Sequence, residues 1–143
     1  HAYWYQDWAM GFGITLRDLE FVEPPAAMDA VNHFLWNMGH QGTLEEGIAS
    51  TNLAIEWATG EWSQSVVKGM KAYQENGVAT INRHSMAWLR AHASYDDDHP
   101  HEAMELIKLV CVDEAQKERA FAAASRGLEY YIQALDYCYD QAG

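Results

Sequence analysis

Three residue types that commonly bind metal ions are spaced along residues 92–99 so that a helix would bring them together: His92, Asp96 and His99. Each residue of an α-helix adds about 100°, so His92 and Asp96 would lie about 40° apart, one turn from each other. His99 follows His92 by about two turns and would drift from it by only about 20°. Two imidazoles and one carboxylate suit iron, manganese or zinc. The spacing therefore predicts a metal-binding face.

Pro100 directly follows the third of these residues. Proline disfavours helical geometry at the residue before it and lacks a backbone N–H donor. We therefore expect the helix to kink or restart at His99.

A fourth candidate ligand is Glu56, which follows Leu53, Ala54 and Ile55 and precedes Trp57. A carboxylate in apolar surroundings is costly to bury unless it is paired or binds a cation. Helical bundles that hold two metal ions use inward-facing Glu and His side chains from several helices. Glu56 on one helix, with the three other residues on a second helix, would form half of such a site.

Both patterns also fit a simpler interpretation. The segment around His92, Asp96 and His99 holds several further acidic residues, which suit an ordinary solvated surface. Glu56 could likewise be one of the many glutamates of exposed helix faces. The remaining histidines after His1 are interpreted as surface or partly packed residues: His33, His40, His84 and His101.

Hydrophobic spacing at helical period and capping signals predict helices along the whole chain. Thr15 with Asp18, Thr43 with Glu46, and Asp113 are the predicted N-terminal caps. The predicted helices cover residues 1–11, Pro24-Pro25 to Gly39 or Gly42, 43 to about 76, 78–95, 100–111 and 113–140. No alternating strand pattern, repeat or linker competes with them. The predicted class is all-α, with residues 1–143 as one helical domain.

Composition limits the partners that we expect. The sequence is 49% hydrophobic and 13% aromatic, which is typical of a packed domain. Its formal net charge of −12, without a basic cluster, would repel a phosphate backbone, so we expect no nucleic-acid partner. There is no signal peptide and no apolar run of membrane-spanning length, so we expect no membrane partner. Cys111 and Cys138 form neither a disulfide framework nor a zinc motif, and we predict a cytoplasmic protein.

The first predicted helix begins at His1, with no capping residue before it. We therefore expect the sequence to be the later part of a larger domain, starting part-way along a helix.

Three blocks of sequence carry a family resemblance. They are His1-Ala2-Tyr3-Trp4 with Trp8; Thr51-Asn52-Leu53-Ala54-Ile55-Glu56 with Thr59-Gly60-Glu61-Trp62-Ser63; and His92-Ala93 with Tyr95-Asp96-Asp97, His99-Pro100 and Glu102-Ala103. Together they resemble the haem-oxygenase-like di-iron oxidases, a family related in fold to the thiaminase-type and pyrroloquinoline-quinone-synthase proteins. Within that family the likeness is greatest to the non-haem iron decarboxylases that convert medium-chain fatty acids to terminal alkenes.

The resemblance implies that His1, Glu56, His92, Asp96 and His99 bind two iron ions and that O2 is a co-substrate. It also implies a haem-oxygenase-like bundle, further carboxylate ligands upstream of His1, a homodimer, and an apolar tunnel for the chain of a carboxylic-acid substrate. The implied reaction removes a hydrogen from the β-carbon of the acid, and carbon dioxide leaves as the alkene forms.

Several alternatives remain open. The same scaffold could oxidise or fragment an amino acid or another small molecule, or it could be a metal-free helical binding protein. A thiaminase-like hydrolase would need a nucleophilic cysteine, and Cys111 and Cys138 lie in apolar and aromatic sequence settings. A metal-free cofactor-synthesis oxidase is a further alternative. Trp57, Trp62 and Trp88 could line a cavity or belong to the core.

Overall fold

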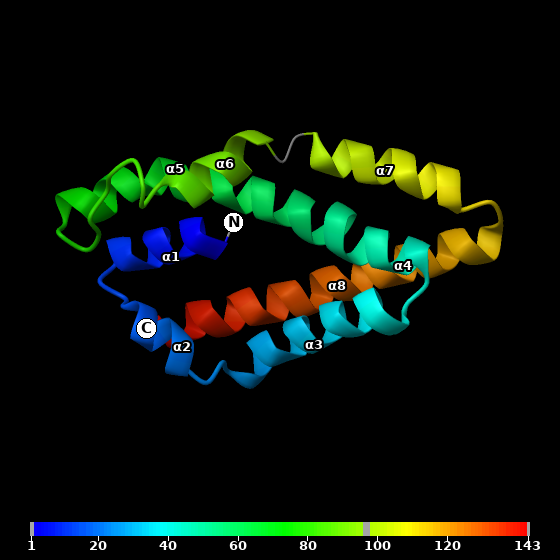
Figure 1. The fold of residues 1–143 in the computed structure, drawn as a ribbon, viewed down its shortest axis with the longest axis horizontal. Helices are drawn as coiled ribbons and strands as arrows, with labels where there is room; N and C mark the ends of the chain where they lie inside the picture. The colour runs from blue at the N-terminus through cyan, green and yellow to red at the C-terminus, as the bar shows by residue number, and fades with distance from the viewer. Residues whose placement is uncertain (1, 96–97, 143) are drawn as a thin grey trace. The chain divides into compact units, whose positions relative to one another are not determined.

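The computed structural model describes residues 2–95 and 98–142, with Tyr95 described for its backbone alone. Every regular element among these residues is a helix, so the predicted all-α class is confirmed (Figure 1). The elements are α1 (Ala2–Gly11), α2 (Leu16–Phe21), α3 (Ala26–Gln41), α4 (Leu44–Ile48), the π-helix η1 (Ala49–Ile55), α5 (Glu56–Glu75), α6 (Ala87–Tyr95), α7 (His99–Val110) and α8 (Glu114–Gln141).

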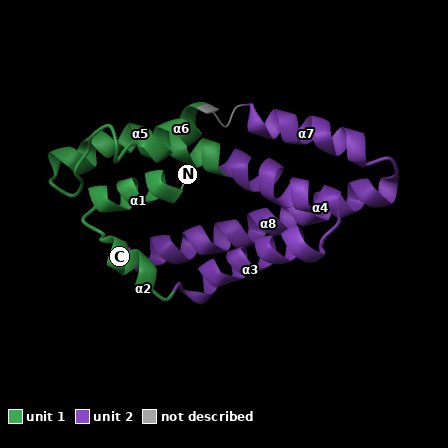
Figure 2. Cartoon of the chain, viewed as in Figure 1, with its two compact units in different colours: residues 1–23, 59–96 green, residues 24–58, 97–143 purple. Residues whose placement is uncertain are grey.

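The chain forms two compact units, which are coloured separately in Figure 2. The first unit comprises His1–Glu23 and Thr59–Asp96, and the second comprises Pro24–Ala58 and Asp97–Gly143. Helix α5 begins in the second unit, and its residues from Thr59 onward belong to the first.

The core of the first unit is rich in aromatic side chains. Met70, Met86 and Leu89 are buried at its centre. Trp62 and Trp88 pack against these residues, and the ring of Trp8 stacks on that of Trp88 with centroids 5.6 Å apart. Trp62 and Trp88 are therefore core residues of this unit, in keeping with the large apolar area that an aromatic ring buries.

The second unit is built around α8, which packs against α3, α4 and η1, while α7 packs against α4 and η1. Gly127 lets α8 approach η1 closely, because a Cβ atom at this position would lie 3.3 Å from the carbonyl oxygen of Ser50. Glu45 of α4 is buried and pairs with Arg119 of α8, at 2.7 Å. Its own backbone N–H and the Arg119 guanidinium lower the pKa of Glu45.

The three predicted N-terminal caps are confirmed by their hydrogen bonds. The backbone N–H of Thr15 donates to the Asp18 carboxylate at 2.8 Å, and the Thr43 N–H donates to Glu46 at the same distance. Asp113 caps α8 by accepting the N–H of Gln116 at 2.8 Å. Each cap satisfies a backbone donor that has no partner within the first turn of its helix.

The predicted helix over residues 78–95 is wrong in its first half, because α6 begins only at Ala87. The side chain of Asn82 accepts the backbone N–H groups of His84 and Ser85, at 2.8 and 3.0 Å. The Ser85 hydroxyl in turn accepts the Asn82 N–H at 2.9 Å. Such local bonds compete with helical hydrogen bonds and favour a turn. Gly77, with a φ of +70°, ends the preceding segment in the left-handed region.

The predicted helix over residues 43–76 is helical along that length but not α-helical throughout. Residues Ala49–Ile55 form a π-helix of seven residues between α4 and α5. Runs of π-helix are rare and usually span one turn, often at functional sites. This one ends immediately before Glu56.

Candidate metal centre

Glu56 is positioned by the end of η1. Its backbone N–H bonds to the carbonyl of Thr51, five residues earlier, and also to that of Leu53. The first of these bonds closes the last π turn on Glu56 itself. The direction in which the Glu56 side chain points is therefore set by the π-helix that precedes it.

His99 is the first residue of α7. Pro100 follows it at the second position and is buried. Proline is well tolerated in the first turn of a helix, where its missing N–H would have no helical partner. The expectation that the chain restarts at His99 is thus confirmed. The expectation that His92 and His99 lie on one helix is wrong, since His92 lies on α6 and His99 on α7.

The structure brings Glu56 and His99 together within the second unit. The Nδ1 atom of His99 lies 3.2 Å from Oε2 of Glu56, with 49% and 35% of the two side chains exposed. Oε2 itself is buried and accepts no hydrogen bond from the described residues. The short distance is therefore an approach of two polar atoms and not a hydrogen bond between them.

This geometry fits a shared metal ion. Metal–ligand bonds of about 2.0–2.2 Å to nitrogen and oxygen place neighbouring ligand atoms about 3 Å apart. The separation of 3.2 Å between the Glu56 oxygen and the His99 nitrogen matches that spacing. A buried carboxylate oxygen without a hydrogen bond also needs a cation or a donor, since burying it alone is costly. Carboxylate with imidazole is a donor set that iron binds, so these two residues fit iron.

His92 has a hydrogen bond that is typical of metal-binding histidines. It lies on α6 in the first unit, where its Nδ1 atom is 2.8 Å from the carbonyl oxygen of Trp88. A carbonyl can only accept, so Nδ1 is the donor of this bond. In the neutral form of the ring, the lone pair is then on Nε2. Histidine ligands are commonly oriented by such a bond to a backbone carbonyl. The ring also lies 4.3 Å from that of Trp88, centroid to centroid.

The remaining predicted ligands, His1 and Asp96, lie outside the described residues. Over residues 2–95 and 98–142, no group of three or more His, Cys, Asp and Glu side chains is close enough to hold a metal ion. Of the five predicted ligands, the structure therefore brings together Glu56 and His99.

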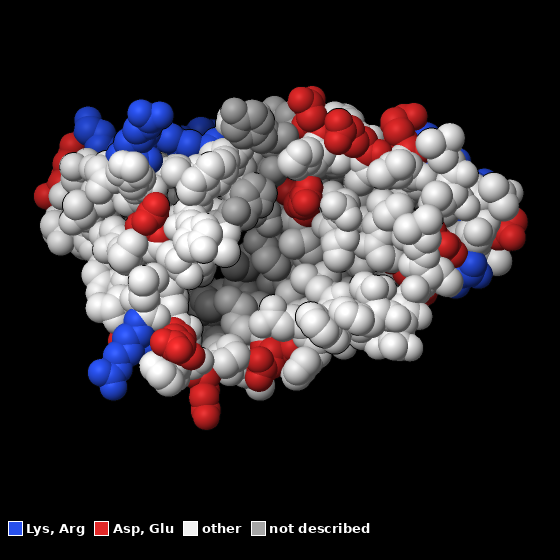
Figure 3. Space-filling model, in the orientation of Figure 1, with Lys and Arg blue, Asp and Glu red and all other residues white. Residues whose placement is uncertain are grey.

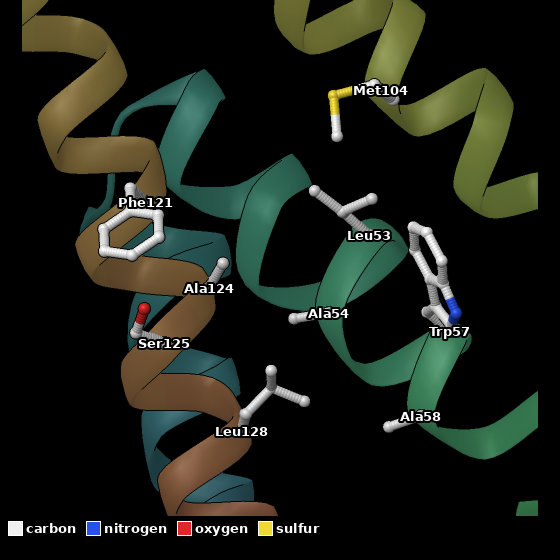
Figure 4. A pocket seen from close by; sticks show the side chains of 9 residues that line it. All are labelled: Leu53, Ala54, Trp57, Ala58, Met104, Phe121, Ala124, Ser125 and Leu128. Carbon is white, nitrogen blue, oxygen red and sulfur yellow. The ribbon is translucent and has the colours of Figure 1, made fainter. Parts of the chain in front are cut away.

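An apolar cavity of about 470 Å³ lies in the second unit (Figure 4). Trp57 lines it from the start of α5, and Figure 4 shows Met104 of α7 and Phe121 of α8 reaching toward it from other walls. The remaining lining residues are Leu53, Ala54, Ala58, Ala124, Ser125 and Leu128. Trp57 was the one residue of this cavity that sequence analysis singled out. The recurrence of 121, 124, 125 and 128 along α8 is the helical spacing that could have indicated the wall formed by α8.

Two further features concern the charge of the surface and the apolar character of the helices. Figure 3 shows acidic side chains gathered over α7, where Glu102 and Glu105 are exposed. Among the described residues, no helix combines the length and the apolar character needed to cross a membrane.

Comparison with known proteins identifies the fold and the family. Residues 1–132 match the model of a haem-oxygenase-like family described as iron-containing redox enzymes. The crystal structure of a TenA homologue from Pseudomonas syringae pv. tomato is similar, with a TM-score of 0.83 and 30% identity over 96% of this chain. The chain spans 57% of the length of that protein. No curated protein matches it. The predicted haem-oxygenase-like fold is thus confirmed, and the chain belongs to the haem-oxygenase-like family of iron-containing redox enzymes.

Proposed function

We propose that this chain supplies iron ligands of an O2-dependent oxidase that acts on a carboxylic acid. The observation that carries the proposal is the approach of His99 Nδ1 to the buried, unbonded Oε2 of Glu56 at 3.2 Å. Family membership supports iron as the metal. We propose two iron ions, with His1, His92 and Asp96 as the further ligands from this chain.

When bound, iron would supply the binding and reduction of O2, which no amino-acid side chain performs. The residues of the chain have a different task, which is to hold the donor atoms in place. Glu56 would contribute its buried oxygen Oε2, and His99 would contribute Nδ1, which lies 3.2 Å from that oxygen. The Trp88 carbonyl holds His92 in the tautomer whose Nε2 can bind a metal.

The cavity beside Trp57 supports an aliphatic substrate. Its volume of about 470 Å³ lies within the range of about 300–1,000 Å³ typical of small-molecule sites. Its walls are almost wholly apolar, and its residues Trp57 and Ala58 directly follow Glu56 along α5. Such walls bind an alkyl chain and exclude water from it. We propose a medium-chain fatty acid, which loses a β-hydrogen and carbon dioxide and becomes a terminal alkene while O2 accepts the electrons.

The proposal is tested with the chain loaded anaerobically with Fe(II) and then exposed to O2 and a panel of medium-chain fatty acids. We expect substrate-dependent O2 consumption and alkene in the headspace, measured with an oxygen electrode and by gas chromatography. Glu56→Gln should abolish both, because an amide is a poor iron ligand. His101→Gln, on the same helix as His99, serves as the matched control and should keep both.

The outcomes separate the decarboxylase from its alternatives. Alkene formation by wild type and by the His101 variant, but not by Glu56→Gln, supports the proposal. O2 consumption that depends on amino acids, without alkene, would instead favour oxidation or fragmentation of another small molecule. A chain that binds no iron would refute an iron-dependent function for these residues.

A further inference from the structure

Thr51 connects the two ends of the π-helix through its side chain and its backbone. Its hydroxyl donates to the carbonyl of Gly47 at 2.6 Å, one turn back in α4. Its own carbonyl accepts the N–H of Glu56, one π turn ahead. Thr51 thus joins the last residues of α4 to the residue that begins α5.

The register of η1 decides which way Glu56 points. A π turn contains one residue more than the corresponding α turn, so its hydrogen bonds run from residue i to i+5. If this stretch were α-helical, one residue would be surplus, and everything after it would be turned by about 100° and moved by about 1.5 Å. A rotation of that size would carry the Glu56 carboxylate away from His99, which lies on a different helix.

Packing against α8 holds the π register in place. Ser50 has no exposed surface, and its hydroxyl donates to the carbonyl of Glu46 at 2.8 Å. A Cβ atom added to Gly127 would lie 3.3 Å from the backbone carbonyl oxygen of Ser50. The hydroxyl groups of Ser50 and Thr51 both bond to carbonyls of α4, which supplies partners where the change of helix type disturbs the regular pattern.

From these contacts we propose that Thr51 is a positioning residue, which holds the π register of η1 and so aims Glu56 at His99. The inference rests on the proposed function, because it assigns Glu56 to a metal ion. Thr51 itself contributes no ligand. Its effect is exerted through the hydroxyl bond to Gly47 and the carbonyl bond to Glu56.

The test measures metal binding rather than turnover, using Co(II), whose visible absorption reports its ligands. Thr51→Val removes the hydroxyl at nearly constant size, and Thr51→Ser keeps it. We expect the first to weaken Co(II) binding by about tenfold and the second to remain near wild type, since the loss of supporting contacts commonly costs 10–100-fold in metal affinity. Far-ultraviolet circular dichroism checks that each variant keeps its helices.

A deletion tests the register directly. Removing Asn52, an exposed residue within η1, takes out the one residue by which the π turn exceeds an α turn, so the segment should become α-helical with Glu56 still directed at His99. Co(II) binding by this variant should therefore stay near wild type, and loss of binding with an unchanged helical signal would contradict the register argument. Asn52→Ala is the matched control for loss of the Asn52 side chain, whose Oδ1 lies 2.9 Å from the Thr51 hydroxyl, and it should also bind Co(II) near the wild-type level because the shorter bond to Gly47 remains.

The results distinguish this inference from the proposed function. If wild type binds no Co(II), or if Glu56→Gln binds it as wild type does, the proposed function fails and the role of Thr51 fails with it. If Glu56→Gln loses the metal while Thr51→Val binds as tightly as Thr51→Ser, the positioning role alone is refuted. Should the deletion variant lose its helical signal, the comparison of valine with serine at position 51 decides the matter.

Discussion

The contact between α8 and η1 predicts opposite effects for two glycine-to-alanine substitutions in the second unit. Gly127 is buried, and an added Cβ would lie 3.3 Å from the Ser50 carbonyl oxygen and 3.4 Å from the Phe34 ring. Gly39 of α3 is exposed, and an added Cβ would meet nothing within 4 Å. Both changes favour the helix intrinsically, by up to about 1 kcal/mol each.

The difference between the two variants isolates the packing cost. Overpacking typically costs about 1–3 kcal/mol, and the Ser50 oxygen belongs to a backbone held by η1, so it cannot move away freely. We therefore expect Gly39→Ala to raise the free energy of unfolding by up to about 1 kcal/mol. Gly127→Ala should lie about 1–3 kcal/mol below Gly39→Ala.

Urea denaturation followed by circular dichroism measures this difference, with the slope of the transition checked for each variant. Equal stabilisation by the two substitutions would refute the close contact between Gly127 and Ser50. It would also remove the packing argument for the π register.

Three further predictions concern the folding of the chain. Leu89→Ala should lower the free energy of unfolding by about 2–5 kcal/mol in urea titrations, because Leu89 is fully buried in the first unit. Asp113→Ala should cost about 1 kcal/mol by the same measurement, through loss of the Gln116 cap. Glu45 has a pKa below its ordinary value of 4.5, so its stabilisation is present above that pH and is lost as the pH falls through the lowered pKa. Thermal melts across the acid range should therefore show a weaker loss of stability on acidification for Glu45→Gln than for wild type, and equal pH dependence would contradict this.

The helix boundaries that depend on local chemistry could be predicted from the sequence. Thr15, Thr43 and Asp113 form caps with side chains three residues away, so the bonds are encoded within one turn. Pro100 acts within the same range, by restricting the residue before it. The late start of α6 also depends on local bonds, since Asn82 and Ser85 form a turn through their side chains. The apolar spacing of residues 78–95 nevertheless favoured the prediction of a helix over the whole segment.

The π-helix could not be predicted in this way. The residues of Ala49–Ile55 suit an α-helix equally well, and no composition rule separates the two forms. The choice depends on contacts with distant residues, above all the fit of Ser50 against Gly127 on α8. The same limitation applies to the candidate site. Glu56 and His99 were both singled out by residue type and surroundings, but their approach depends on how α5 and α7 are placed within the second unit.

The apolar cavity depends still more on tertiary packing, since its walls come from α5, α7, α8 and η1. The position of Trp57 directly after Glu56 in the sequence indicates that it could line a cavity near the candidate site. Phe121 is largely exposed, and only its helical spacing with the other cavity residues of α8 could have indicated it.

The central claim is that Glu56 and His99 bind the same iron ion, and anomalous diffraction at the iron absorption edge tests it most directly. Crystals of the chain loaded with Fe(II) under anaerobic conditions should show a peak about 2.0–2.2 Å from both Glu56 Oε2 and His99 Nδ1. A peak elsewhere, or no peak with Glu56 Oε2 hydrogen-bonded to a protein donor, would contradict the claim.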